Sequence, residues 1–240
     1  MTPHGTNPHG TNPPDPSAHA LGAHGAGAHG PGARDEETLG PHLAAWPAGI
    51  LLAAGEGRRL GRPKALLELD GERLVDRGVR VLREGGCSPV LVVAGAAQIE
   101  VIGAVVVPNP DWREGMGSSL RAGLAALPSG CPAAVVALVD QPRVTAAAVG
   151  RLVAAYEAGA GIAVATYGGA PRNPVLLGAA HFAAVAEAAA GDVGARGFLR
   201  AHPDLVTGVP CDDVAAPDDI DTPADLAAYT LRKAGPRGPR

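Results

Sequence analysis

The sequence predicts an α/β fold in which helices cover both faces of a largely parallel sheet. Short continuous apolar runs alternate with stretches of helical periodicity, as expected for buried parallel strands joined by helices. The chain has 240 residues, 46% of them hydrophobic, which is enough for one ordinary domain with a buried core. Three polar clusters directly follow apolar runs, and ligands of such sheets bind outside the carboxyl ends of the strands.

The elements can be assigned in order along the chain. The first apolar run, Gly49 to Ala54, ends at Gly55 and is typical of a buried strand. A helix should follow, because Leu74, Val75, Val79 and Leu82 recur at helical spacing. The expected strands are 49–54, 90–94, 105–107, 134–139, 161–166 and 174–177, and the expected helices are 72–85, 118–127, 145–158, 179–189 and 193–201.

The two ends of the chain differ from this pattern. Residues 1–45 are rich in Gly, Pro and His, contain six of the eight histidines and show almost no apolar periodicity. We expect a disordered tail, and the alternative is a tail that binds Ni²⁺ or Zn²⁺. Residues 232–240 read as a second, basic tail, which leaves 46–231 as the folded domain.

Composition excludes several classes of function. The net charge of −4 argues against a general binder of nucleic acid. No apolar run is long enough to span a membrane, and the N-terminus lacks the order of a secretory signal. Cys87, Cys131 and Cys211 are odd in number and have no metal-ligand spacing. We therefore expect a reduced, cytoplasmic protein.

The first polar cluster, residues 53–64, reads AAGEGRRLGRPK. Glycines after a buried strand allow backbone N–H groups to surround an anion. Four cations within seven residues suit a triphosphate: Arg58, Arg59, Arg62 and Lys64. The spacing is not that of a P-loop, and Leu60 stands where a dinucleotide fingerprint needs Gly or Ala. A glycine-rich turn beside a solvated basic run is the alternative.

The second cluster, residues 109–120, reads NPDWREGMGSSL. We expect Gly117, Ser118 and Ser119 to open the next helix, with backbone donors and two hydroxyls facing outward at its positive end. An N-cap followed by a turn would give the same pattern. Trp112 and Met116 suit packing as well as ligand contact.

Asp140 is the first candidate metal ligand. It ends a buried strand and precedes Gln141 and Pro142. This is a usual position for a carboxylate that binds Mg²⁺ bridging phosphates. A carboxylate at the end of a strand is also common as a helix cap.

Asp221 is the second candidate. The residues after it look like a helix start, with Thr222 as N-cap, Pro223 at N1 and Asp225 at N3. Capping explains Thr222 and Asp225 but leaves the carboxylate of Asp221 without a role. Asp221 is therefore available as a second ligand for a metal.

These motifs, in this order, resemble the MobA-like nucleotidyltransferases, and most closely their MocA-type branch of molybdenum cofactor cytidylyltransferases. The resemblance covers about residues 48–230. It rests on five segments: 52–64, 109–124, 140–142, 191–196 and 219–223. It implies a Rossmann-like three-layer α/β/α sandwich of the nucleotide-diphospho-sugar transferase type. It also implies transfer of NMP from an NTP to a phosphorylated acceptor, with release of pyrophosphate.

The resemblance also implies roles for single residues. Arg59 and Lys64 would stabilise charge on the leaving group and the α-phosphoryl group, and with Asp140 they form the catalytic set. Asp140 and Asp221 would hold Mg²⁺.

Nucleotide binding would involve the same first cluster. Gly55 and Gly57 would surround the phosphates together with Arg59 and Lys64. The backbone near Ala53 and Ala54, with Ser119, would recognise the base.

The acceptor and the nucleotide follow from finer points of the resemblance. Family members that use GTP tend to carry a second glycine where this chain has Ala54, which favours CTP. A molybdopterin-type cofactor is then the expected acceptor, and a molybdenum hydroxylase is a possible client protein. The family often has Gly-His-Pro-Val where this chain has Arg172-Asn173-Pro174-Val175. Asn173 therefore suggests a changed acceptor or a weaker activity.

Other functions stay open at this point. A related nucleotidyltransferase with another NTP or another small phosphorylated acceptor is the first. A nucleotide-binding chaperone that delivers a cofactor would not need both Lys64 and the two carboxylates. Metal storage through the His-rich tail is a third. A dinucleotide-dependent oxidoreductase is disfavoured, because no acidic residue that could bind a ribose follows the second strand.

Overall fold

Seven strands form the central sheet of residues 46–234, the part of the chain that this computed structural model describes. In chain order they are β1 (Ala48–Leu52), β4 (Val90–Ala94), β5 (Val105–Pro108), β6 (Ala133–Leu138), β7 (Ile162–Tyr167), β8 (Ala170–Gly178) and β9 (Val206–Pro210). Their order across the sheet is β5-β4-β1-β6-β8-β7-β9, and β8 alone runs antiparallel to its neighbours. The predicted mostly parallel sheet is confirmed.

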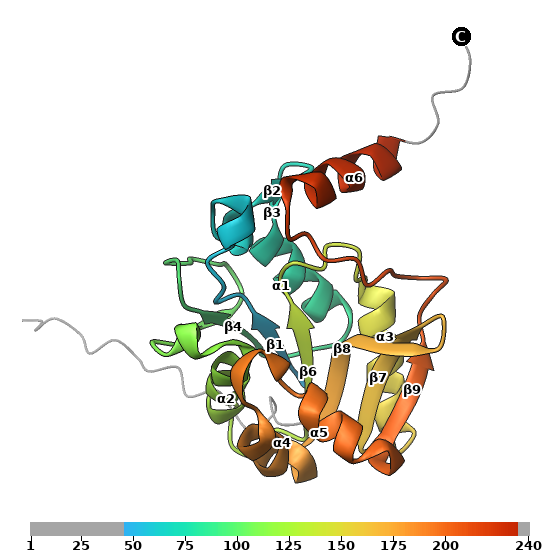
Figure 1. Ribbon diagram of the computed structural model, residues 1–240. Coiled ribbons are helices and arrows are strands. Elements are labelled where there is room, and N and C mark those ends of the chain that lie inside the picture. Colours follow the sequence, from blue (N-terminus) through green and yellow to red (C-terminus); the bar gives the residue numbers. More distant parts are fainter. Residues whose placement is uncertain (1–45, 235–240) are drawn as a thin grey trace, which may run out of the picture. The chain divides into compact units, whose positions relative to one another are not determined.

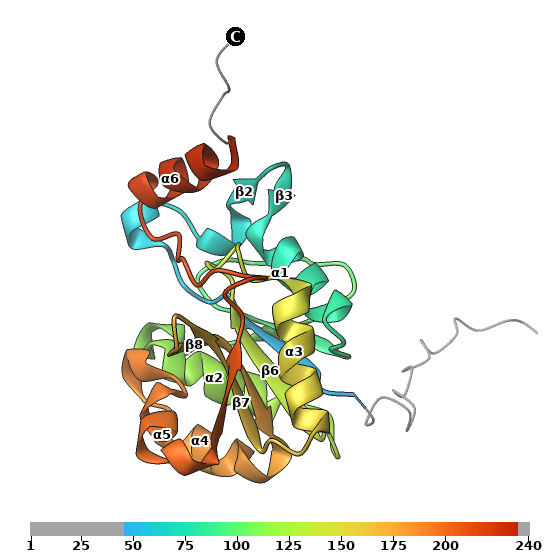
Figure 2. The ribbon, with the colours of Figure 1, turned by 90° about the vertical axis from the view of Figure 1, so that its right-hand side faces the viewer.

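Helices cover both faces of this sheet, so the predicted three-layer sandwich is also confirmed (Figure 1). Seen edge-on, α1 and α3 lie on one face and α2, α4 and α5 on the other (Figure 2). The helices are α1 (Leu74–Glu84), α2 (Met116–Ala125), α3 (Ala146–Glu157), α4 (Phe182–Ala188), α5 (Arg196–Ala201) and α6 (Pro223–Ala234).

The side chains of β1 point alternately to the two faces of the sheet, which explains why helices cover both faces. Leu51 belongs to one core cluster with Val75 and Val79 of α1, whereas Ile50 belongs to another with Leu120 of α2. Successive side chains of a strand point to opposite faces, and all five residues of β1 are buried. A strand that is apolar on both sides needs a helix layer on each side.

The structure corrects several predicted bounds. The second long helix, α2, begins at Met116, so Gly117 lies inside it. Strand β9 was not predicted, because Gly208 and Pro210 weaken its strand signal; it forms by pairing with β7. A short hairpin of β2 (Glu68–Leu69) and β3 (Glu72–Arg73) was not predicted either.

The structure bears on the predicted C-terminal tail but not on the predicted N-terminal tail. The expected tail of residues 1–45 lies outside the described residues. At the other end α6 continues to Ala234, three residues into the segment predicted as a basic tail, and 235–240 lie outside the described residues. Between residues 46 and 234, no helix combines the length and the apolar character that crossing a membrane requires.

Strand direction determines where the polar clusters lie. Because β1, β4, β5 and β6 are parallel, the segments that follow them emerge at one edge of the sheet. The chain returns to this edge after β9, where the backbone N–H of Ile220 donates to the carbonyl of Asp140 over 2.9 Å. The fold thus brings five distant segments of the sequence to one place.

Candidate functional site

A cavity of about 430 Å³ lies at the carboxyl edge of the sheet. It is bounded by the loop after β1, the start of α2, the end of β6 and the segment before α6. All of the site residues predicted from the sequence, except one, line it: Ala54, Gly55, Gly57, Arg59, Lys64, Ser119, Asp140 and Asp221. Ala53 does not line the cavity and is 3% exposed.

The loop after β1 folds back on itself at Gly57. This residue has a φ of 65°, and a Cβ there would lie 2.0 Å from the carbonyl oxygen of Arg62. Only glycine fits such a turn. Gly55 is different, because a Cβ there would meet nothing within 4 Å and would extend into open space. Gly57 therefore shapes the loop, whereas Gly55 leaves room beside it.

Lys64 joins the two predicted metal ligands. Its ammonium nitrogen donates to Asp140 Oδ2 over 2.7 Å and also to Asp221 Oδ1. Arg59 donates to the other oxygen of Asp221 over 2.8 Å. The side chain of Lys64 is 16% exposed, and that of Asp140 is 20% exposed. Four charged groups from three distant segments thus form one partly buried cluster.

Each charge in this cluster stabilises its neighbours. Burial alone would lower the pKa of Lys64, but Asp140 and Asp221 outweigh burial and raise that pKa above its usual value. The hydrogen bond from Lys64 lowers the pKa of Asp221, and Arg59 lowers it further. At neutral pH the cluster therefore contains the charged ammonium of Lys64 beside the ionised carboxylate of Asp221.

The other two predicted cations are not part of this cluster. Arg58 is exposed and pairs with Glu56 of the same loop. Arg62 is exposed and does not line the cavity. Of the four basic residues in the first cluster, the structure thus brings Arg59 and Lys64 to the carboxylates.

The predicted helix start after Asp221 is confirmed as a reciprocal cap. Asp225 Oδ2 accepts from the backbone N–H of Thr222 over 2.8 Å, and the N–H of Asp225 donates to Thr222 Oγ1 over 3.2 Å. This arrangement satisfies donors at the beginning of α6. The carboxylate of Asp221 takes no part in this cap and instead accepts a hydrogen bond from Lys64.

The hydroxyls at the start of α2 face inward, which corrects the prediction. Ser118 and Ser119 are each 4% exposed, and both accept from Asn109 Nδ2 over 3.0 Å. Ser118 in turn donates to carbonyls of Asp111 and Gly115. Ser118 therefore fixes the loop before α2, while Ser119 also contributes to the cavity wall.

The backbone at Ala53 and Ala54 is partly used within the fold. The N–H of Ala53 donates to the carbonyl of Val93, and the carbonyl of Ala54 accepts from the N–H of Ala96, both over 3.0 Å. The N–H of Ala53 is therefore used within the fold, whereas the carbonyl of Ala54 keeps a second lone pair.

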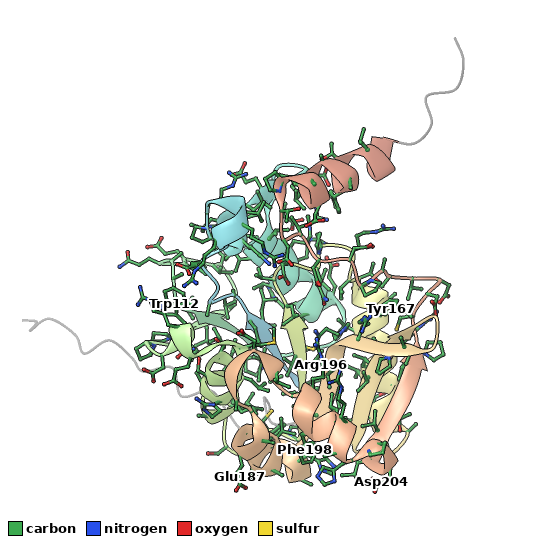
Figure 3. The ribbon with its side chains drawn as sticks, viewed as in Figure 1. Trp112, Tyr167, Glu187, Arg196, Phe198 and Asp204 are labelled. Atoms are coloured by element: carbon green, nitrogen blue, oxygen red, sulfur yellow. The ribbon has the colours of Figure 1, made fainter. Side chains whose placement is uncertain are left out.

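Trp112 lies on the β4 side of the cavity (Figure 3). A Cβ at Gly95, just after β4, would lie 2.5 Å from Trp112 Cβ, so glycine permits this close packing. The guanidinium carbon of Arg113 lies 4.4 Å from the centre of the Trp112 ring. The sequence left open whether Trp112 packs or contacts a ligand, and its position allows both.

Asp192 lines the cavity although the sequence analysis did not select it. It lies against Gly115, where a Cβ would come within 2.6 Å of both Asp192 Oδ1 and the carbonyl carbon of Gly191. In the sequence, the signal that could have pointed to Asp192 is the pair of nearby glycines, Gly191 and Gly194. Asn173 does not line the cavity; it lies in β8, two residues before Val175, which pairs with Val136 of β6.

The sequence is similar to those of known proteins. The profile of the family described as "MobA-like NTP transferase domain" matches residues 49–206. The chain is similar to a nicotine blue oxidoreductase of Paenarthrobacter nicotinovorans, with 42% identity over 72% of this chain and 91% of that protein. It is also similar to a probable molybdenum cofactor guanylyltransferase of Opitutus terrae, with 42% identity over 49% of this chain and 59% of that protein.

A solved structure shows the same fold. The structure of a Mycobacterium tuberculosis Rv0371c homolog, from Mycobacterium sp. strain JC1, matches with a TM-score of 0.69 and 32% identity. The match covers 78% of this chain and 97% of that one.

Proposed function

The chain belongs to the MobA-like NTP transferase family, and we propose that it moves CMP from CTP onto the terminal phosphate of a molybdopterin-type cofactor. In this reaction an oxygen of the acceptor phosphate attacks the α-phosphorus of CTP. The bond from that phosphorus to the oxygen bridging to the β-phosphate breaks, and pyrophosphate leaves.

One observation carries the proposal: Lys64 bridges Asp140 and Asp221 beside a glycine-rich loop that lines the same cavity. A triphosphate needs donors and cations, and a phosphoryl transfer needs opposite charges held in place before the reaction. A binding protein without catalysis would not need both the cations and the carboxylates.

The residues present fit a Mg²⁺ ion. Asp140 and Asp221 both reach the ammonium of Lys64, so a cation already lies between them. Within residues 46–234 there is no group of three or more His, Cys, Asp or Glu side chains suited to a metal. Mg²⁺ is usually held by one or two carboxylates together with substrate phosphates, which is what these two residues offer. When bound, Mg²⁺ would neutralise charge on the phosphates.

The other residues position the reactants. Gly55 leaves open space beside the loop where phosphates can approach the backbone. Arg59 and Lys64 supply positive charge for the developing pyrophosphate. When the phosphates bind, Lys64 can exchange its carboxylate partners for them. Holding both substrates in line is itself a large part of catalysis in this class of reaction.

The choice of CTP rests on Ala54. Ala54 and Trp112 both line the cavity, and a Cβ at Gly95 would lie 2.9 Å from Ala54 Cβ and 2.5 Å from Trp112 Cβ, so the methyl group of Ala54 takes up space that a glycine would leave free. A smaller pyrimidine base suits this arrangement better than a purine. The molybdopterin acceptor and a client molybdenum hydroxylase rest on the family resemblance.

The proposal is tested by thermal unfolding of the protein with Mg²⁺ and each of CTP, GTP, ATP and UTP. A ligand that binds the native state raises the melting temperature. We expect a shift with CTP that is absent in Asp140→Ala, and release of pyrophosphate when molybdopterin is added. Preference for another nucleotide would contradict the choice of CTP, and no turnover with any pterin acceptor would contradict the acceptor.

A second candidate function follows from the relative named nicotine blue oxidoreductase, which matches over most of its length. This chain would then reduce or oxidise a related pigment. The test is absorbance of NADH or NADPH during incubation with such pigments. Oxidation of the nicotinamide that persists in Lys64→Met and Asp140→Asn would favour this second function over nucleotidyl transfer.

A further inference from the structure

The segment that carries Asp221 has no helix or strand of its own. Residues 212–222, here called the strap, connect β9 to α6 and lie along the turn formed by residues 140–145. Three hydrogen bonds to backbone carbonyls join the strap to this turn. Thr145 Oγ1 donates to the carbonyl of Val214 (2.9 Å), the N–H of Ala216 to the carbonyl of Arg143 (3.3 Å), and the N–H of Ile220 to the carbonyl of Asp140 (2.9 Å).

Two side chains of the turn also contact the strap: Arg143 donates to Asp218 Oδ2 over 3.2 Å at the surface, whereas Gln141 contacts the strap from a buried position. Its exposed fraction is 7%, and its Nε2 donates to Asp219 Oδ1 over 2.8 Å. Its Oε1 is also buried and has no hydrogen-bond partner within residues 46–234. A buried amide oxygen without a partner is unfavourable for stability. The side chain is therefore poorly explained by stability alone.

The position of Asp219 in the strap gives this contact a consequence for the active site. Asp219 and Asp221 flank Ile220, which is 2% exposed and packs in the core with Leu51 and Val139. The buried side chain of Ile220 anchors this part of the strap in the core, between the two carboxylates. The bond from Gln141 to Asp219 supplies a second point on the opposite side of Ile220 from Asp221.

We propose that Gln141 is a positioning residue: its amide holds Asp219 so that Asp221, two residues later, presents its carboxylate to Lys64 beside Asp140. Asp140 and Gln141 are consecutive residues of one turn. This turn therefore positions the carboxylate of Asp140 directly and that of Asp221 indirectly, through the contact from Gln141 to Asp219. The inference rests on the proposed function, because it assigns a task to the cluster.

Charge explains why an amide suits this position. Two other carboxylates belong to the same corner of the fold, because Asp221 follows Asp219 by two residues and the N–H of Ile220, between them, donates to the carbonyl of Asp140. A neutral donor can hold Asp219 without adding charge. A carboxylate at position 141 would face that of Asp219 and repel it.

The first experiment is a reciprocal exchange. In Gln141→Glu two carboxylates would meet, and we expect kcat to fall about 10- to 100-fold, the range for residues that support metal ligands. In Asp219→Asn the amide of Gln141 can still donate to the new side-chain oxygen, and kcat should stay within about threefold of the wild type. In the double variant the new amide at position 219 can donate to the new carboxylate at position 141, so most of the lost activity should return. Gln98→Glu, which changes the other glutamine of the chain at an exposed position, is the matched control.

The second experiment separates positioning from stability. Gln141→Leu removes the donor together with the unpartnered oxygen, so the melting temperature should hold or rise. If Gln141 positions the strap, this variant should still lose activity at least tenfold, bind Mn²⁺ with CTP more weakly, and exchange the amide hydrogens of residues 212–222 faster. A residue with only a structural role would lose activity in step with stability.

Two results would overturn the inference. One is an intact kcat in Gln141→Leu together with unchanged exchange in the strap. The other is a folded double variant that recovers none of the activity lost in Gln141→Glu. If the wild type turns over no nucleotide, the proposed function fails, while Mn²⁺ binding and hydrogen exchange in the Gln141 variants still decide whether Gln141 positions the strap.

Discussion

The two walls of the cavity are built in different ways. The glycine-rich loop, residues 53–64, is one continuous segment whose shape depends on contacts within itself, such as the close approach of Gly57 to the carbonyl of Arg62. The charged cluster begins at the end of this loop and joins Lys64 to Asp140, 76 positions away, and to Asp221, 157 positions away. The loop can be recognised by its local sequence, whereas the cluster exists only in the folded chain.

This difference has a consequence for how each wall fails. Damage to the loop changes local backbone geometry and should appear in stability and in nucleotide affinity. Damage to the cluster removes charge without removing much packing, because its members are hydrophilic and partly exposed. It should appear mainly in catalysis.

The largest expected effect comes from removing a charge of the cluster. Asp140→Asn keeps the shape of the side chain, and we expect kcat to fall by about 10²-fold or more, because charge fixed in advance dominates this chemistry. Pyrophosphate release measures it, and circular dichroism should show a folded protein. Asp204→Asn is the control, since Asp204 is exposed and precedes β9 at the amino edge of the sheet (Figure 3). Equal activity of both variants would remove Asp140 from the mechanism.

Lys64→Met tests whether the ammonium occupies the position of a metal. Without the ammonium, the two carboxylates should bind Mn²⁺ alone more tightly, on the order of tenfold or more. Titration calorimetry without nucleotide measures this affinity. An unchanged or weaker affinity would show that Asp140 and Asp221 do not form a cation site.

The same variant gives a pH dependence. Because Lys64 lowers the pKa of Asp221, their pairing stabilises the fold above the ordinary carboxyl pKa and loses this effect as the pH falls through the lowered value. The wild type should therefore exceed Lys64→Met in the free energy of unfolding near neutral pH; the difference should begin to shrink below about pH 4 and should vanish only below the lowered pKa of Asp221. Urea unfolding at several pH values measures the difference. A gap that is constant with pH would contradict the pairing.

Two alanine variants sharpen the comparison within the loop. In Gly57→Ala the φ of 65° and the clash with Arg62 should cost about 1–3 kcal/mol of stability. Gly55→Ala places its methyl in open space, so the melting temperature should hold while KM for the nucleotide rises by about tenfold. Thermal unfolding and steady-state kinetics separate the two. A Gly55→Ala enzyme with unchanged KM would mean that phosphates do not approach there.

The smallest expected effect lies next to the cluster. Thr222→Ala removes one side of the cap that begins α6 and should lower the free energy of unfolding by about 1 kcal/mol. Chemical denaturation measures it. The hydrogen bonds from the N–H of Ile220 to Asp140 and from Gln141 to Asp219 still hold the strap, so kcat should fall much less than in Asp140→Asn. If kcat fell as much in Thr222→Ala as in Asp140→Asn, the cap of α6 rather than the strap would position the carboxylate of Asp221.

Much of the fold was predictable because its signals are local. The run at 49–54 is apolar on both faces, so it had to be a covered strand, and Thr222, Pro223 and Asp225 marked a helix start that the structure confirms. What failed was also local in origin. The weak strand β9 forms because β7 offers it a partner, and the serines in the first turns of α2 face inward because Asn109 donates to both of them.

By itself the sequence determined six of the seven strands of the central sheet, the glycine loop and the residue types that the chemistry needs, because periodicity, turn geometry and charge are properties of short segments. Tertiary structure alone decided that Lys64 lies between Asp140 and Asp221, that Asp192 faces the cavity and that Gln141 holds Asp219. These relations join residues far apart in the chain, and they depend on strand order and on how the strap crosses from β9 to the end of β6. No local pattern encodes such distances, since they arise only when the packed core brings the segments together.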